Sequence, residues 1–332
     1  MEPMGTFSNV GKRQKDRKVQ KVIEMLSKDN PILDHAPVIE CNNGTTHRST
    51  VRTGLPKSYW AMVGEPVPDS TDDTAQLTED TGTMEQWLSV PKNLLKIQTD
   101  PETYLLSRNK ASIEGLRQDM AENLFYGSRK GNPASFNGLH YRFNTLDEDE
   151  AETANNIIDM GGTGNRLTSI WLATWDPETM HLLYPAGSTG GIQFETFPQH
   201  VSETDKGNLI KHKTHYMWDM GLAVVDWRYQ VRIANIDSQN LDALINNGAG
   251  TPADWKLIRA MVAGRRKTPR AKIGKQIWYM NRDTKTMIDL IAAEKSNVYL
   301  KITEFEGKPV TFFQGIPIEE CDAIVNTEEQ VI

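Results

Sequence analysis

The 332-residue sequence contains only two cysteines, Cys41 and Cys321, far apart and outside any CxxC motif. This spacing argues against a disulfide framework and against a cysteine-based metal site. Apolar runs are only a few residues long, whereas a membrane-spanning helix needs about 20 apolar residues, so we expect no membrane span. The N-terminus lacks the apolar core of a signal peptide, and we therefore expect the chain to remain in the cytoplasm where it is made.

Catalytic and cofactor motifs are also missing. Gly161–Asn165 is glycine-rich, yet it lacks the Lys-Ser/Thr ending of a Walker loop and the spacing of a dinucleotide-binding loop. On a helix, the spacing of His212, His215 and Asp219 could bind a metal ion. The sequence around them predicts a strand instead, and on a strand the two histidines point to opposite faces. We therefore predict no catalytic residue, no cofactor and no metal site, and we expect a protein that is not an enzyme.

Charge is distributed unevenly along the chain. The net charge of −7 argues against general affinity for nucleic acid. We assign residues 1–46 to an N-terminal arm, which is either a solvated terminal helix or a segment that binds an acidic or subunit surface. A second basic stretch, residues 265–275, is either a solvated loop or a contact for phosphate or an acidic neighbour. The basic residues of the arm are Lys12, Arg13, Lys15, Arg17 and Lys18.

The stretch from Asp100 to Gly127 predicts one long helix, residues 101–126, around which the chain is organised. Asp100 suits the N-cap and Pro101 the first helical position. Gly127 suits a left-handed stop just past the end. At about 1.5 Å per residue the helix would be roughly 40 Å long, typical either of a spine that carries other parts or of a long core helix of an enzyme. The expected apolar stripe is Leu106, Ile113, Leu116, Met120 and Leu124.

Residues 47–92 are polar, rich in threonine and poor in core residues, and they predict a long β-hairpin. The turn-forming run Gly64–Asp69 divides two legs that carry Leu55 and Trp60 on one side and Trp87 on the other. An isolated two-stranded ribbon is marginal in water, so this hairpin makes sense if it lies on a neighbouring molecule. The alternative is a flexible surface loop, which would be unusually long.

The remaining segments predict an α+β fold with long strands towards both ends of the chain. We expect a buried strand after Thr168 and a short helix ending at Tyr184. Residues 227–236 alternate as a half-buried strand does. Three short helices should begin at Asp237, Thr251 and Asp283, and residues 298–318 and 322–325 should supply the last strands.

Seven segments, taken in order from about residue 47 to the C-terminus, resemble the major capsid protein of short-tailed double-stranded DNA bacteriophages. Each motif alone is modest, but their order along the chain is specific. The segments are Gly54–Trp60, Glu122–Gly127, Phe136–Leu139, Trp171–Tyr184, Asp226–Asp237, Tyr279–Arg282, and Gly315–Glu319 with Asp322–Ile324.

This resemblance implies the Hong Kong 97 capsid fold. Residues 47–92 would be the extended hairpin loop, residues 93–150 and 275–332 the peripheral domain with its spine helix, and residues 151–274 the axial domain. The function it implies is self-assembly, as pentamers and hexamers, into the icosahedral shell that encloses the phage genome. Shells would assemble in the cytoplasm of the bacterial host.

The resemblance also suggests partners and contact residues. Besides other copies of the chain, the partners would be a scaffolding protein, a portal, a cement or decoration protein, and packaged DNA on the inner face. The inter-subunit contact candidates are Trp60, Trp87, Leu55 and Lys57. The basic residues of the arm would face DNA or scaffold. The alternatives are an oligomeric enzyme with a swapped hairpin and another structural protein of the phage head.

Overall fold

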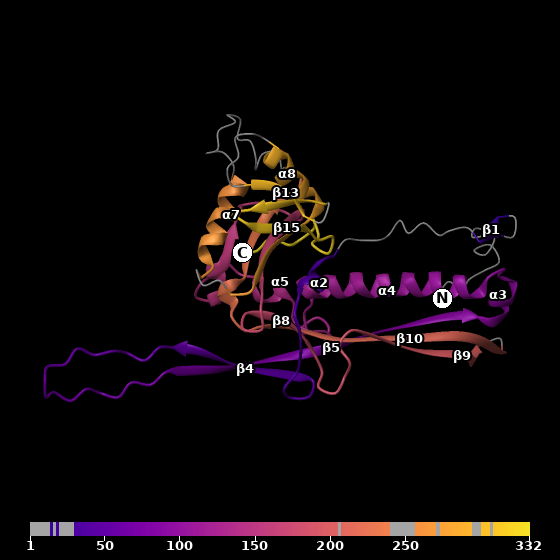
Figure 1. Cartoon of the computed structure of the whole chain (residues 1–332), viewed down its shortest axis with the longest axis horizontal. Helices are drawn as coiled ribbons and strands as arrows, with labels where there is room; N and C mark the ends of the chain where they lie inside the picture. The colour runs from indigo at the N-terminus through magenta and orange to yellow at the C-terminus, as the bar shows by residue number, and fades with distance from the viewer. Residues whose placement is uncertain are drawn as a thin grey trace.

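The computed structural model describes residues 14–15, 18–19, 30–204, 207–239, 256–269, 273–293, 300–305 and 308–332. Figure 1 shows three parts: a long helix lying along a long sheet, a more compact body around a second sheet, and a hairpin that projects away from both. We call the first part the elongated body and the second the compact body. This mixture of helices and sheets confirms the α+β class.

Helix α4, Pro101–Tyr126, is the predicted spine helix. Its N-cap is Asp100, whose carboxylate accepts hydrogen bonds from the Thr103 N–H at 3.1 Å and the Thr103 hydroxyl at 2.5 Å. These bonds lower the pKa of Asp100. Leu116, Met120 and Leu124 are buried as expected, and Ile113 is partly buried.

Two predictions about this helix are wrong. Leu106 is 55% exposed, because the buried residue of that turn is Tyr104, and a side chain two positions further along a helix points to a nearly opposite face. Gly127 is not left-handed: its φ is −55° and its ψ is 138°. Glycine is needed there because a Cβ would lie 2.5 Å from the Asn123 carbonyl oxygen and 2.7 Å from that of Phe136.

The elongated body contains a six-stranded sheet in the order β3-β8-β10-β5-β4, with β9 also paired to β10. Strand β5 changes partner along its length: its first part pairs with β4 up to Asp80, and residues from Thr81 on pair with β10. Leu88 and Val90 of this second part pack against Tyr104 and Leu116 of α4. The strands are β3 Val38–Glu40, β4 Thr46–Gly54, β5 Asp73–Pro91, β8 Met180–Tyr184, β9 Ile192–Thr204 and β10 Gly207–Val224, and short helices α2 Ile32–His35 and α3 Lys92–Ile97 accompany them.

The compact body contains a seven-stranded sheet in the order β13-β14-β15-β12-β7-β11-β6. Its strands are β6 Ile157–Asp159, β7 Leu167–Trp175, β11 Val231–Asp237, β12 Lys275–Met280, β13 Leu300–Phe305, β14 Lys308–Phe313 and β15 Ile316–Glu320. The helical elements are α5 Leu139–Arg142, η1 Glu152–Asn156, η2 Trp227–Tyr229, α7 Lys256–Lys267 and α8 Arg282–Ala293. Side chains of α7 and α8 pack on one face of this sheet, and α4 and α5 supply residues to the core on the other.

The sheets correct several local predictions. Met180–Tyr184 is strand β8 and not a helix, because its backbone pairs with both β3 and β10. Residues 227–229 form a 3-10 helix and not part of a strand. Strand β11 is buried along nearly its whole length and not half-buried, because the sheet is covered on both faces. Residues 322–325 form no strand. Arg265–Lys267 are the last turn of α7, not part of a loop.

The expected domain boundary at residue 274 does not follow the sheets. Strands β12 to β15 lie in the same sheet as β7 and β11, whereas β8, β9 and β10 belong to the sheet under the spine helix. The helix expected after Asp237 and the start of the one expected at Thr251 lie outside the described residues. Helix α8 begins at Arg282, one residue before Asp283.

Candidate subunit interface

The predicted hairpin is present, but its paired part is shorter than the sequence suggested. Strands β4 and β5 pair from Thr46 opposite Asp80 to Gly54 opposite Asp73. Residues 55–72, which we call the distal loop, contain no strand and extend well away from both bodies (Figure 1). A turn at its tip is closed by the Glu65 N–H, which donates to the Met62 carbonyl at 3.1 Å.

The distal loop exposes large apolar side chains. Trp60 is fully exposed and Leu55 is 78% exposed. Met62 and Val63, at the tip of the loop, are exposed to at least a similar extent. Lys57 is exposed too, with its backbone N–H donating to Ser70 Oγ at 2.6 Å. Contiguous exposed apolar surface on a soluble chain marks an interaction site.

Trp87 does not belong to this surface. It lies in the part of β5 that pairs with β10, opposite His215, and stacks on that ring with centroids 4.1 Å apart. Lys213 Nζ lies 5.6 Å from the Trp87 ring centroid, within cation–π distance. The structure therefore separates Trp87 from Leu55, Lys57 and Trp60, which share the distal loop.

The arm residues are only partly described. In the backbone register of the short ladder between β1, Gln14–Lys15, and β2, Lys18–Val19, Lys15 is paired with Lys18. Lys12, Arg13 and Arg17 lie outside the described residues.

A largely buried ion pair anchors the hairpin to the body. Arg142 of α5 donates to both carboxylate oxygens of Glu79 in β5, at 2.7 and 2.6 Å. Its guanidinium also reaches the Leu222 carbonyl of β10 at 3.3 Å. A bidentate pair fixes orientation as well as distance, so it sets the angle at which the hairpin leaves the sheet. The sequence gives no local signal for this pair, because its members are 63 positions apart.

Arg142→Ala should lower the free energy of unfolding by about 2–3 kcal/mol, because it leaves the Glu79 carboxylate buried without its partner. Hydrogen exchange should quicken first in the amides of β4 and β5. The matched control is Arg52→Ala, whose pair with Asp72 is exposed and should contribute less than about 1 kcal/mol. Equal effects of the two substitutions would contradict the anchoring role.

A second buried network joins the two bodies. Arg232 of β11 donates to Glu328 Oε2 at 2.8 Å, and both side chains are almost completely buried. The Tyr126 hydroxyl, at the end of α4, donates to Glu328 Oε1 at 2.6 Å, and Ser169 of β7 donates to Oε2. The pKa of Tyr126 is raised mainly by burial of its hydroxyl and, to a smaller extent, by the negative charge of Glu328. The C-terminal segment is thereby tied to the spine helix and the compact sheet.

One buried histidine, His181, and one partly buried histidine, His140, predict acid sensitivity. Burial is the main cause that lowers the pKa of His140 and of His181 to about 4, with Arg232 and His47 respectively adding to the effect. Because an unfolded histidine titrates near 6.5, their contribution to stability is full above about pH 6.5 and is lost as the pH falls towards 4. Chemical denaturation between pH 7.5 and 4 should show this fall, and His140→Gln or His181→Gln should flatten it. An unchanged slope in both variants, or an equal change in the exposed His200→Gln, would contradict it.

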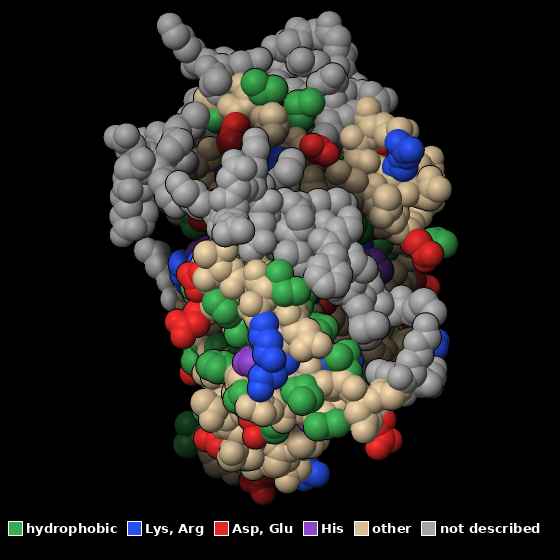
Figure 2. All heavy atoms as spheres, turned by 90° about the vertical axis from the view of Figure 1, so that its right-hand side faces the viewer, with side chains coloured by type: hydrophobic (Ala, Val, Ile, Leu, Met, Phe, Trp, Pro, Cys, Tyr) green, Lys and Arg blue, Asp and Glu red, His purple; other side chains and the backbone are tan. Residues whose placement is uncertain are grey.

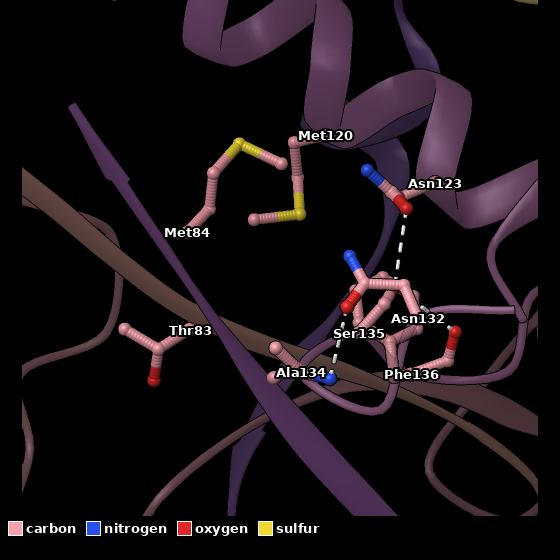
Figure 3. A pocket seen from close by; sticks show the side chains of 9 residues that line it. Thr83, Met84, Met120, Asn123, Asn132, Ala134, Ser135 and Phe136 are labelled. Carbon is pink, nitrogen blue, oxygen red and sulfur yellow. Dashed lines mark hydrogen bonds between the residues drawn. The ribbon is translucent and has the colours of Figure 1, made fainter. Parts of the chain in front are cut away.

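The pocket drawn in Figure 3 is small and is lined by uncharged side chains. It has a volume of about 110 Å³ and lies between β5, the end of α4 and residues 132–136. Met84 and Met120 lie side by side on one side, and on the other Ser135 Oγ donates to Asn123 Oδ1 at 3.1 Å. Its lining contains no His, Cys, Asp, Glu, Lys or Tyr side chain, so it offers no acid or base that would activate the Ser135 or Thr83 hydroxyl.

In the described part of the chain, no three His, Cys, Asp or Glu side chains gather as a metal site would require. His212 and His215 lie on strand β10, as predicted, and burial lowers the pKa of His212. Among the described helices, none combines the length and the apolar character that crossing a membrane requires.

Comparison with solved structures places this arrangement in a known class. A chain in the structure of bacteriophage epsilon15 is 28% identical, with a TM-score of 0.73, and the match covers 99% of this chain and 98% of that one. A chain of the bacteriophage JBD30 capsid is 9% identical, with a TM-score of 0.51, and the match covers 90% of this chain and 93% of that one. At this identity the likeness is one of fold alone. A search of curated proteins finds no match. The long helix on its sheet, the compact body and the projecting hairpin are those of Hong Kong 97 type capsid proteins, which form shells.

The chain belongs to the family of major capsid protein GP7, whose model matches residues 14–332. It is therefore a structural component of a phage capsid, and it associates with further copies of itself to form the shell.

Proposed function

We propose that the chain assembles as pentamers and hexamers into an icosahedral shell that encloses the phage double-stranded DNA, and that it does so in the bacterial cytoplasm. The observation that carries this proposal is the distal loop, which holds a fully exposed Trp60 and other apolar side chains away from the body that bears them. Within the described part of the chain, no other segment of the same copy packs over these side chains.

Each copy would give its distal loop to one neighbour and receive a loop from another. Such a head-to-tail contact generates closed rings when its rotation closes. Burying apolar surface contributes about 25 cal/mol per Å², and large aromatic residues are the usual anchors of interfaces. Trp60 is therefore the proposed anchor, with Leu55 and Lys57 beside it.

The two bodies suggest how each copy is oriented in the shell. We assign the elongated body to the periphery of each capsomer and the compact body to the region near its symmetry axis. Basic residues 12–18 would face packaged DNA or a scaffolding protein. The net charge of −7 keeps the rest of the shell from binding DNA, since each phosphate contact adds salt-dependent affinity. A portal and a cement protein are further proposed partners.

Trp60→Ala should cut the yield of closed shells at least tenfold while leaving the folding of the single chain unchanged, because the side chain is fully exposed. Shell yield is measured by gradient sedimentation and negative-stain imaging, and folding by chemical denaturation. The matched control is Leu106→Ala, which removes an exposed apolar side chain from the spine helix. Normal shells from Trp60→Ala, with unchanged resistance to denaturant, would contradict the proposed contact.

A further inference from the structure

A pocket of about 530 Å³ lies where the base of the hairpin meets the long sheet. His47 and other residues of β4 line one part of it, and His181 of β8 and the turn before that strand line another. Glu178 belongs to this turn, and Asp226 lies just after β10. We call this feature the hairpin-base pocket. It brings together two histidines that are far apart in the sequence.

The two histidines lie against each other with ring nitrogens that lack partners. Their ring centroids are 5.5 Å apart and their planes are nearly perpendicular, at 84°. His181 is only 2% exposed, yet neither of its ring nitrogens has a hydrogen-bond partner of good geometry among the described residues. His47 Nδ1 is buried and lacks such a partner as well. Buried polar atoms are nearly always satisfied in native proteins, so these three nitrogens point to a ligand.

The His181 ring is uncharged at neutral pH. Burial, followed by the neighbouring His47, lowers its pKa to about 4. A neutral imidazole carries a free lone pair on one nitrogen and an N–H on the other. The backbone of Asp176 and Pro177 lies near the ring and opposes the shift in pKa. A metal-bound histidine usually donates its second N–H to a backbone carbonyl, which this stretch supplies.

The charges around the hairpin-base pocket do not exclude a cation. Arg52 and Arg228 also line it, but each forms an ion pair with an aspartate, which offsets its charge. Glu178 is exposed and belongs to no ion pair among the described residues. The pocket therefore offers two imidazoles and one carboxylate that is not committed to a cation of the chain.

We propose that the hairpin-base pocket binds one divalent transition metal ion such as Zn²⁺, with one nitrogen of His47 and one of His181 as ligands. Imidazole is a preferred ligand of zinc, copper and nickel. Two imidazoles bound to one tetrahedral ion, with bonds of about 2.1 Å, have ring centroids roughly 5 Å apart. No third imidazole, thiol or carboxylate gathers with them in the described part of the chain, so the Glu178 side chain turns towards the ion as the third ligand.

The metal ion would join the base of the hairpin to the long sheet. Strand β4 belongs to the hairpin, whereas β8 lies between β3 and β10. The Arg142–Glu79 pair ties β5 to α5, and the ion would tie β4 to β8 in addition. An ion that binds only the folded chain stabilises it. The sequence predicted no metal site because the two histidines come from different strands without a local motif, and the inference concerns the single chain, independently of shell assembly.

The control histidine lies on a surface of a different kind. His200 is exposed on β9, which extends towards the end of the elongated body away from the hairpin (Figure 1). Figure 2, viewed from that end, shows acidic, basic and hydrophobic side chains intermixed, with histidines few and separate. His200→Gln therefore removes an imidazole and leaves the hairpin-base pocket intact.

Calorimetric titration of the unassembled full-length chain with Zn²⁺ at neutral pH tests the site. Wild type and His200→Gln should bind one ion with the same affinity. His47→Gln and His181→Gln should each weaken binding by about tenfold or more, since loss of an outer partner of a metal ligand alone costs that much. Glu178→Gln should weaken it by a smaller factor. Mg²⁺, which prefers oxygen ligands, should not bind.

Hydrogen exchange gives a second measurement, which locates the ion. Saturating Zn²⁺ should slow exchange of the β4 and β8 amides about tenfold in wild type and less than about twofold in His47→Gln. His47 is only partly buried, so His47→Gln decides the question if His181→Gln does not fold. Absence of Zn²⁺ binding by wild type, equal affinity in wild type and His47→Gln, or an equal loss in His200→Gln would each overturn the proposal.

Discussion

Glu328→Ala should lower the free energy of unfolding by about 3–5 kcal/mol, the range expected when one member of a buried ion pair is removed. Arg232, which is completely buried, would lose its carboxylate partner at 2.8 Å. The Tyr126 hydroxyl would lose an acceptor at 2.6 Å, and Ser169 would lose one as well. A single substitution near the C-terminus would thus disturb the spine helix and two strands of the compact sheet.

The neighbouring residue supplies the control for this prediction. Glu329 is exposed, so Glu329→Ala should change the free energy of unfolding by less than about 0.5 kcal/mol although it removes the same charge. Urea denaturation of unassembled protein measures both. If Glu328→Ala were within 1 kcal/mol of wild type, the network would not couple the two bodies.

Gly138→Ala should destabilise the fold by about 2–3 kcal/mol, because it overpacks a close contact between backbones. A Cβ at Gly138 would lie 2.7 Å from the Asn123 carbonyl oxygen and 2.8 Å from those of Leu124 and Phe125. These carbonyls belong to the last turn of the spine helix. The loop after the helix would have to move, and with it the hydrogen bond from the Gly138 N–H to the Gly127 carbonyl at 2.8 Å.

Gly115→Ala, within the spine helix itself, should have the opposite effect on stability. Nothing lies within 4 Å of a Cβ at Gly115, so alanine should raise the free energy of unfolding by about 0.5–1 kcal/mol through its better helix propensity. Thermal or urea denaturation of both variants measures the difference. Effects of the same sign would show that backbone proximity is not what requires glycine at position 138.

The spine helix was predictable because its signals are local. Asp100 and Pro101 mark the start, and the apolar spacing from Leu116 to Leu124 marks the buried face. Strand β8 was not predictable in this way, because Met180–Tyr184 becomes a strand only when β3 and β10 lie on either side of it. Sheet pairing between distant segments overrides local preference.

The interface was predictable in part, for the same reason. The scarcity of core residues in the hairpin pointed to a partner, and the structure leaves Trp60 fully exposed there. The sequence could not separate Trp87 from Trp60, because β5 changes partner at Thr81 without a local signal. Nor could it reveal that Arg232, on a strand read as half-buried, pairs with Glu328, since 96 residues separate them.

Sedimentation of the purified protein, with negative-stain imaging of the fast fraction, tests the central claim most directly. The account predicts closed shells, or pentamers and hexamers that convert to shells when the phage scaffolding protein is added. A monomer or dimer that forms no shell, either alone or with that scaffold, would contradict it.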